Sequence, residues 1–320
     1  MSKAVVGLNR AAVPKVAIEI DGSGEVAPQP TSVGGRIAAY VALTKPRIIE
    51  LLLITTVPAM ILAASGMPSV WLVAMTLVGG TLSAGGANAI NCYVDRDIDE
   101  IMPRTRKRPL PQHRIEPRSA LVFGIVLGSA GFGLLWATVN LPAALLSTGA
   151  LLFYVFVYTM GMKRHTPQNI VIGGAAGAAP VLVGWAAVTG RVGLPALAMF
   201  GIIFYWTPPH FWALSMRYEK DYASAGVPMM PVVYGKSETT KHILLYSILL
   251  FAMCLALFSV AHLGPLFLVT VIVLNALFIG WAVKLWKDPT PRRAWGLFRY
   301  SIYYLAVLFA AIAVDALVGR

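Results

Sequence analysis

Nine stretches of about 20 mainly apolar residues follow one another along the chain, separated by polar or turn-forming segments. A helix of that length crosses the hydrocarbon core of a bilayer and satisfies its backbone hydrogen bonds within its own segment. The pattern therefore predicts an all-α, polytopic membrane protein with nine transmembrane helices. The predicted spans cover residues 47–65, 70–94, 118–138, 142–162, 168–189, 194–215, 241–262, 265–286 and 297–318.

Residues 1–42 lack this apolar pattern. They are rich in proline and glycine and mix basic with acidic residues, and no continuous apolar run follows the first basic residues. We expect no cleaved signal peptide in such a segment. The pattern predicts a disordered cytoplasmic tail at 1–42, followed by one nine-helix membrane domain at 43–320.

Composition and charge agree with a membrane protein and indicate its orientation. Charged residues make up 12% of the chain, against about 25% in soluble domains. On the predicted topology, all but two of the 26 lysines and arginines, Arg191 and Arg320, lie on the side of the tail. Basic residues gather on the cytoplasmic side, so we expect a bacterial inner membrane, a cytoplasmic N-terminus and a periplasmic C-terminus. Topology accounts for the net charge of +12, and we expect no nucleic-acid partner.

An acidic cluster ends the second predicted span. Four of the 14 acidic residues fall within six positions, at Asp95, Asp97, Asp99 and Glu100. With Asn91, two of them form a series at i, i+4 and i+8, which places Asn91, Asp95 and Asp99 on one helix face and turns Asp97 away. Oxygen ligands on one face suit Mg²⁺, and Arg104 and Arg108 follow closely enough to bind the remaining oxygens of a diphosphate.

Two other kinds of structure contain such a cluster of acidic residues, a solvated helix end and an EF-hand. A solvated helix end with local Asp–Arg pairs remains open. An EF-hand is excluded, because its sixth position holds Glu100 instead of glycine and its twelfth holds Arg106 instead of glutamate.

The spacing Asn-x-x-x-Asp-x-x-x-Asp with a downstream Arg-Pro resembles the first aspartate-rich motif of the intramembrane prenyltransferase superfamily. Three longer stretches, at 102–111, 158–190 and 206–212, resemble the protoheme IX farnesyltransferase family within it. The resemblance covers residues 40–315. It implies nine helices around a central cavity, Mg²⁺ as cofactor, and transfer of a farnesyl group from farnesyl diphosphate to a vinyl group of haem B, giving haem O and diphosphate. A downstream haem-modifying or oxidase-assembly protein is an expected partner beside the lipid bilayer.

The resemblance also implies roles for particular residues. Asp95 and Asp99 are expected to bind metal together with Asp221 in a second motif, which departs from the family pattern because Arg217 stands where an aspartate is usual. Asn91 is expected to act with these aspartates. The basic residues expected to hold diphosphate or haem propionates are Arg104, Arg108, Lys163 and Arg164, although each could serve only membrane topology.

Four further residues are expected to bind substrate. Tyr158, with Tyr93 and Trp206 as further candidates, offers a π face to an allylic cation. Asn169 either donates to diphosphate or bonds a neighbouring helix. His210 either ligates haem iron or is a buried histidine that bonds another helix. Tyr218 precedes Asp221 in the second motif. No catalytic role is expected for Glu50 or Asp315.

Rival functions remain at this point. A prenyltransferase with a quinone-precursor acceptor would share the acidic motif. A haem-binding or transport protein would place ionisable groups near the middle of the membrane, whereas here they gather at one face.

Overall fold

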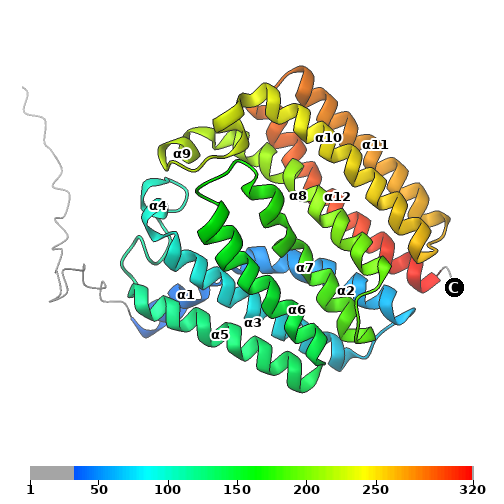
Figure 1. The fold of residues 1–320 in the computed structure, drawn as a ribbon, viewed down its shortest axis with the longest axis horizontal. Coiled ribbons are helices and arrows are strands. Elements are labelled where there is room, and N and C mark those ends of the chain that lie inside the picture. Colours follow the sequence, from blue (N-terminus) through cyan, green and yellow to red (C-terminus); the bar gives the residue numbers. More distant parts are fainter. Residues whose placement is uncertain (1–31, 319–320) are drawn as a thin grey trace, which may run out of the picture.

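Residues 32–318 are described by the computed structural model, and they form helices without any strand (Figure 1). Nine long helices coincide with the nine predicted spans, which confirms the predicted fold class. They are α2 (Pro46–Ala64), α3 (Val70–Val94), α5 (Pro117–Thr138), α6 (Leu141–Leu152) continued by the π-helix η1 (Phe153–Met162), α7 (Asn169–Thr189), α8 (Leu194–Arg217), α10 (Met230–Ala261), α11 (Pro265–Lys287) and α12 (Pro291–Val318). By length and composition, seven of these, all except α2 and α8, could cross a membrane. The chain is an integral membrane protein.

The long helices pack as a closed series in chain order. Each of α3, α5, α6, α7, α8, α10, α11 and α12 contacts the next, and α2 closes the series by packing against both α12 and α3. Helix α2 also packs against α7, and α8 packs against α12. These cross-contacts divide the bundle, so that the amino-terminal helices α2 to α7 enclose their own interior.

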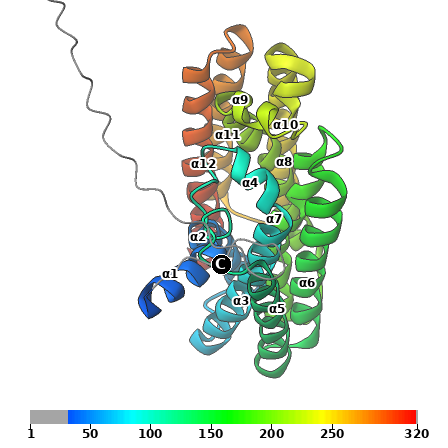
Figure 2. The same cartoon turned by 90° about the vertical axis from the view of Figure 1, so that its left-hand side faces the viewer.

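Three short helices lie outside the main bundle: α1 (Val33–Leu43), α4 (Arg96–Ile101) and α9 (Glu219–Ser224). Helices α4 and α9 lie at the same end of the molecule, and the end of α12 lies at the opposite one (Figures 1 and 2). The prediction of a disordered tail is wrong for its last ten residues, because Ser32 caps a regular helix that begins at Val33. Residues 1–31 lie outside the described part of the chain.

Helices α3 and α5 approach each other closely because glycines meet at their crossing. A Cβ atom at Gly86 would lie 2.6 Å from the carbonyl oxygen of Gly124 and 2.7 Å from the nitrogen of Gly128. Small residues allow such backbone approach between membrane helices. The crossing fixes the position of α3, the helix that carries the acidic motif.

Two elements differ from the regular helices predicted. The second half of the span 142–162 is a π-helix, in which Lys163 donates its backbone N–H to the carbonyl of Tyr158, five residues earlier. Helix α10 begins at Met230, well before the predicted residue 241, and contains a break at Gly235 with φ 75°. Glycine adopts this backbone conformation readily. Both departures occur at the end of the bundle that carries α4 and α9 (Figure 1).

Asp315 has a structural role at the other end. Its carboxylate accepts hydrogen bonds from the backbone N–H groups of Gly264 (2.6 Å) and Phe267 (3.1 Å). These groups begin α11, where helical N–H groups lack partners. The carboxylate thus joins the end of α12 to the start of α11.

Candidate functional site

The acidic motif continues from α3 into α4 almost as one helix. Asp95 donates its N–H to the carbonyl of Asn91, and Asp99 donates to the carbonyl of Asp95, each at 2.9 Å. The side chain of Asp95 is 0% exposed and that of Asp99 2%, whereas that of Asp97 is 60% exposed. Asn91 is buried on the same face. The predicted shared face of Asn91, Asp95 and Asp99 is therefore the buried one, and Asp97 points away from it as predicted.

Asp95 lies at the centre of a buried polar network. Its Oδ2 accepts hydrogen bonds from Lys163 Nζ and from Asn91 Nδ2 (2.7 Å). Arg164 lies 3.5 Å from Asp95 Oδ1 and makes a two-pronged ion pair with Asp97, at 2.6 and 2.7 Å. The hydrogen bond from Arg164 lowers the pKa of Asp97, while the same contact raises the pKa of Arg164. Residues distant in sequence thus converge on the motif.

Asp99 has its own cation. Arg108 Nη1 donates to Asp99 Oδ2 at 2.6 Å. Burial by itself lowers the pKa of Arg108, but the charge of Asp99 and the hydrogen bond to it outweigh burial and raise it. Thr105 holds the loop between them by donating to the carbonyl of Asp99 at 2.9 Å.

Lys45 also contacts the acidic motif, and it is not among the residues predicted for the site. Its Nζ donates to Asn91 Oδ1 at 2.6 Å, and burial lowers its pKa to about 8. Lys45 precedes Pro46 and adopts φ 53°, a left-handed conformation that is uncommon outside glycine and is often found at functional sites. A basic residue just before a predicted span was the available signal, but 46 residues separate it from Asn91.

The site contains buried oxygen atoms that accept no hydrogen bond, although Arg164 lies at ion-pair distance (3.5 Å) from one of them, Asp95 Oδ1. In the described part of the chain, four buried side-chain polar atoms lack a hydrogen-bond partner: Asp95 Oδ1, Asp99 Oδ1, Asn169 Oδ1 and Trp212 Nε1. Buried acceptors of this kind are rare in folded proteins. Two of them are carboxylate oxygens on one helix face, which is the ligand type that Mg²⁺ prefers. The residues present therefore fit a divalent cation, which Asp95 and Asp99 would hold through these oxygens.

The loop after α8 approaches this site through Arg104. Arg104 donates to the hydroxyl of Tyr222 at 3.2 Å, and its guanidinium lies over the rings of Tyr218 (5.6 Å) and Tyr222 (5.8 Å). The half-buried carboxyl group of Asp221 makes no hydrogen bond or ion pair with any residue between 32 and 318. Within that range, no three His, Cys, Asp or Glu side chains are grouped closely enough to hold a metal ion. Asp221 is therefore not joined to Asp95 and Asp99 in this structure.

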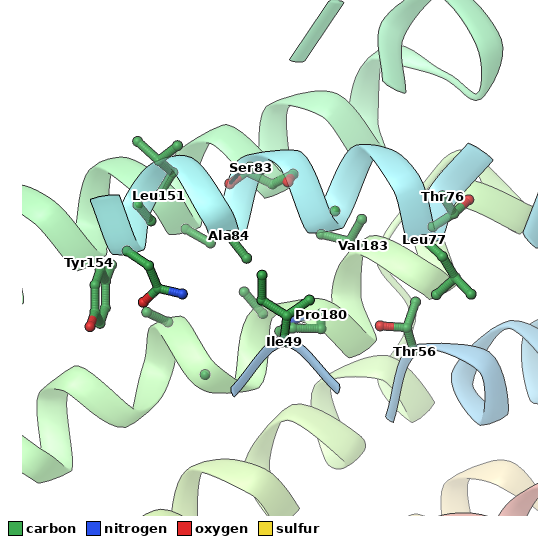
Figure 3. Close-up of a pocket in the computed structure, with 18 residues that line it drawn as sticks. Ile49, Thr56, Thr76, Leu77, Ser83, Ala84, Leu151, Tyr154, Pro180 and Val183 are labelled. Atoms are coloured by element: carbon green, nitrogen blue, oxygen red, sulfur yellow. Dashed lines mark hydrogen bonds between the residues drawn. The ribbon is translucent and has the colours of Figure 1, made fainter. Parts of the chain in front are cut away.

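An apolar cavity adjoins the acidic face among α2, α3, α6, η1 and α7. Its volume is about 150 Å³, it is partly open to the outside, and its lining is mostly alanine, glycine, leucine and valine. Asn88, one turn before Asn91, lines the cavity on the side of the acidic motif. Tyr154 lies at one end of the cavity, and Thr56, Thr76 and Leu77 lie at the other (Figure 3). The predicted central cavity thus lies in the amino-terminal half of the bundle.

The π-helix brings further groups between the cavity and the polar network. Thr159 accepts from Asn91 Nδ2 at 3.1 Å and donates to the carbonyl of Tyr154 at 2.8 Å. The ring of Tyr158 lies 5.3 Å from that of Tyr154 and packs over Gly173, where a Cβ atom would collide with it. Asn169 donates to the carbonyl of Lys163 at 3.2 Å, which connects the start of α7 to the site.

His210 lies in the interface between α8 and α12. Its Nδ1 is 2.6 Å from the hydroxyl of Ser301, and its ring stacks on Trp206 at 4.3 Å. Because Ser301 donates its only proton to the carbonyl of Phe298, Nδ1 is the donor, and a neutral ring carries its lone pair on Nε2. The helix-bonding interpretation accounts for Nδ1, and a ligand role for Nε2 stays a prediction.

Several proteins of similar sequence are named protoheme IX farnesyltransferase. The "Protoheme IX farnesyltransferase" of Frankia alni is 56% identical over 295 residues, which cover 89% of this chain and 100% of that protein. "Protoheme IX farnesyltransferase 1" of Saccharopolyspora erythraea is 54% identical over 301 residues, covering 93% and 96%. The protein of that name from Mycobacterium avium is 49% identical, covering 92% and 97%.

Solved structures share the fold at lower identity. A structure described as digeranylgeranylglyceryl phosphate synthase matches with a TM-score of 0.74 at 19% identity, covering 88% of this chain and 98% of that one. A UbiA homolog from Archaeoglobus fulgidus, bound to GPP and Mg²⁺, matches at 0.61 and 18%, covering 86% and 99%. The model of the UbiA prenyltransferase family matches residues 52–311. This chain therefore belongs to the UbiA prenyltransferase family.

Proposed function

We propose that this protein transfers the farnesyl group of farnesyl diphosphate to a vinyl group of haem B (protoheme IX), with addition of water, to give haem O and diphosphate. The observation that carries the proposal is the position of two buried carboxylates, each with one oxygen that accepts no hydrogen bond, beside an apolar cavity. The name shared by relatives about half identical to this chain supports haem as the acceptor.

The chemistry requires stabilisation of a leaving group and protection of a cation. The bond between C1 of the farnesyl chain and diphosphate oxygen breaks, and diphosphate keeps the electron pair. The vinyl π electrons form the new carbon–carbon bond with C1. Water then adds to the resulting cation and loses a proton, which leaves a hydroxyethyl-farnesyl substituent. The polar network supports the first step, and the apolar cavity excludes water from the allylic cation.

The charges of the network suit a metal–diphosphate complex. Four cations, Lys45, Arg108, Lys163 and Arg164, contact the motif, which contributes Asn91 and the three carboxylates Asp95, Asp97 and Asp99. A bound Mg²⁺ would neutralise charge that develops on the departing diphosphate. Asp95 and Asp99 would hold it through their unpaired oxygens, with Asp221 as a further ligand from the second loop. The solved structure of a UbiA homolog bound to GPP and Mg²⁺ supports a metal ion beside a prenyl diphosphate.

The remaining predicted residues receive roles that follow their positions. Lys163 and Arg108 hold the diphosphate oxygens, because they already bind the two buried carboxylates. Arg104 and Tyr218, at the outer edge, contact the haem propionates or the diphosphate. Tyr158 faces the allylic cation, and Asn169 donates to diphosphate. These assignments rest on the contacts described above.

We place the site at the cytoplasmic face of a bacterial inner membrane, with the N-terminus cytoplasmic and the C-terminus periplasmic. The excess of lysine and arginine on the tail side supports this orientation. Haem O would then be available to a downstream haem-modifying or oxidase-assembly protein. A reporter that is active only in the periplasm should be active when it is fused after Val318 or inserted in the loop at Arg191. Activity of a reporter that works only in the cytoplasm, at both positions, would reverse the topology.

The reaction is tested with membranes that contain the protein. Given haem B, farnesyl diphosphate and Mg²⁺, they should form a farnesylated haem detectable by mass spectrometry, and control membranes should not. Unchanged haem together with prenylation of 4-hydroxybenzoate would replace this proposal with a quinone-precursor prenyltransferase. Tight binding of haem without turnover of any prenyl diphosphate would indicate a haem-binding or transport protein.

A further inference from the structure

The cavity beside the acidic motif has a definite depth along α3. Its lining on this helix runs from Asn88, one turn before Asn91, to Leu77 and Thr76, which lie at the far end from Tyr154 (Figure 3). Asn88 and Leu77 are eleven positions apart, which spans roughly 16 Å at about 1.5 Å per residue. An isoprenoid unit has four chain bonds of about 1.5 Å and extends roughly 5 Å, so three units need about 15 Å. The depth suits a farnesyl chain.

Gly80 occupies a particular level of this cavity. It lies eight residues from Asn88, or roughly 12 Å along the helix, where a chain of two isoprenoid units ends and a third begins. A Cβ atom at Gly80 would meet nothing within 4 Å. Its neighbour Gly79 faces α5 instead, where a Cβ atom would lie 2.5 Å from Leu135. Because Gly80 lines the cavity, a side chain at this position would enter the cavity.

We infer that Gly80 determines the length of the prenyl donor, by leaving room for the third isoprenoid unit above an end wall that includes Leu77. This inference rests on the proposed function. A larger residue at position 80 closes the far end of the cavity, beyond the second isoprenoid unit. A smaller residue at position 77 makes the cavity deeper.

Three variants and three donors test the inference. Gly80→Leu, Leu77→Ala and Gly149→Leu are assayed with geranyl, farnesyl and geranylgeranyl diphosphate, with haem B as acceptor and products separated by mass. Gly80→Leu should lower the ratio of kcat/KM for farnesyl over geranyl diphosphate at least about tenfold, since a hydrophobic pocket discriminates at this level for even one methylene. Leu77→Ala should raise the use of geranylgeranyl diphosphate.

Gly149→Leu is the matched control. Gly149 lies on α6, is exposed on the outside of the bundle and also has nothing within 4 Å of a Cβ atom, so its donor preference should equal that of the unchanged protein. An unchanged farnesyl-to-geranyl ratio in Gly80→Leu would overturn the inference. If Gly80→Leu does not fold, the inference is overturned by an unchanged donor preference in both Gly80→Ala and Leu77→Ala. Failure of the unchanged protein to prenylate haem with any donor would instead overturn the proposed function.

Discussion

Asp95 and Asp97 are two positions apart in the chain, but their surroundings differ. Asp95 is fully buried among Asn91, Lys163 and Arg164, whereas Asp97 is exposed and pairs with Arg164 from outside. A helix turns by about 200° over two residues, which explains why only one of them faces the interior. The two carboxylates therefore provide a test and its control within the same motif.

Asp95→Asn should lower kcat at least about 100-fold, as loss of a preorganised electrostatic partner commonly does. The amide keeps the shape of the side chain but removes its charge, so the protein should stay folded in detergent. Asp97→Asn should keep most of the activity. Turnover is measured as farnesylated haem per mole of folded protein. Full activity of Asp95→Asn would remove Asp95 from the metal site.

Lys45 should contribute to donor binding through Asn91. A hydrogen bond to a charged group contributes about 1.5–3 kcal/mol, so Lys45→Met should lower kcat/KM for farnesyl diphosphate about 10- to 100-fold. Lys45→Arg should recover part of this loss. Lys107→Met, which removes an exposed lysine from the neighbouring loop, is the control. Equal effects of the two methionine variants would contradict a specific role for Lys45.

At the scale of elements, the apolar pattern predicted every long helix, and several ends agree within one residue, as in Pro117–Thr138 for 118–138. Burial in lipid requires long apolar helices, so the sequence carries this signal directly. The π-helix η1 and the early start of α10 leave no such signal. The first is set by packing around Tyr154 and Thr159, and the second lies in a polar segment broken at Gly235.

The same contrast holds for the site. The spacing of Asn91, Asp95 and Asp99 can be read along one helix. The contact between Lys45 and Asn91 depends on how α2 packs against α3, and so does the position of Asn88 at the cavity. Long-range packing of this kind is not visible in local periodicity.

The glycine crossing of α3 and α5 should be essential for stability. Gly124→Val would push a Cβ atom to 2.7 Å from Ile90 and 3.0 Å from the carbonyl of Gly86. We expect a loss of about 1–3 kcal/mol, as for other overpacked interiors, and a lower midpoint of thermal unfolding in detergent. Gly133→Val, on the same helix with open space around its Cβ, should unfold close to the temperature of the unchanged protein. Equal midpoints for both variants would show that the crossing can adapt.

At the scale of the whole molecule, polar chemistry gathers at one end of the bundle. The helices α4 and α9, which come from distant parts of the chain, lie there together (Figure 2), and Arg104 connects their loops through Tyr218 and Tyr222. At the opposite end, Asp315 joins α11 to α12. Carboxylates thus lie at both ends of the bundle. On our proposal, Asp95 and Asp99 serve catalysis at one end, whereas Asp315 serves helix packing at the other.

Removal of divalent cations should stop the reaction without unfolding the bundle. With excess chelator we expect turnover to fall at least about 100-fold, because no protein cation can bridge two carboxylates and diphosphate. Helical content by circular dichroism should be unchanged, since the described helices pack through apolar and glycine contacts. Added Mg²⁺ should restore turnover. Undiminished turnover under chelation would contradict metal-assisted departure of diphosphate.

The unpaired oxygens of Asp95, Asp99 and Asn169 have a consequence for the lifetime of the protein. Each buried acceptor without a donor lowers folding stability by about 1–3 kcal/mol. A metal–diphosphate complex, whose cation supplies the missing partner of the carboxylate oxygens, binds only the folded state and therefore stabilises it, by about 2.7 kcal/mol at 100 times its Kd. Cells that run short of isoprenoid diphosphate would then hold this protein in its least stable form. Its abundance would follow the supply of its own donor substrate, with proteolysis as the link between them.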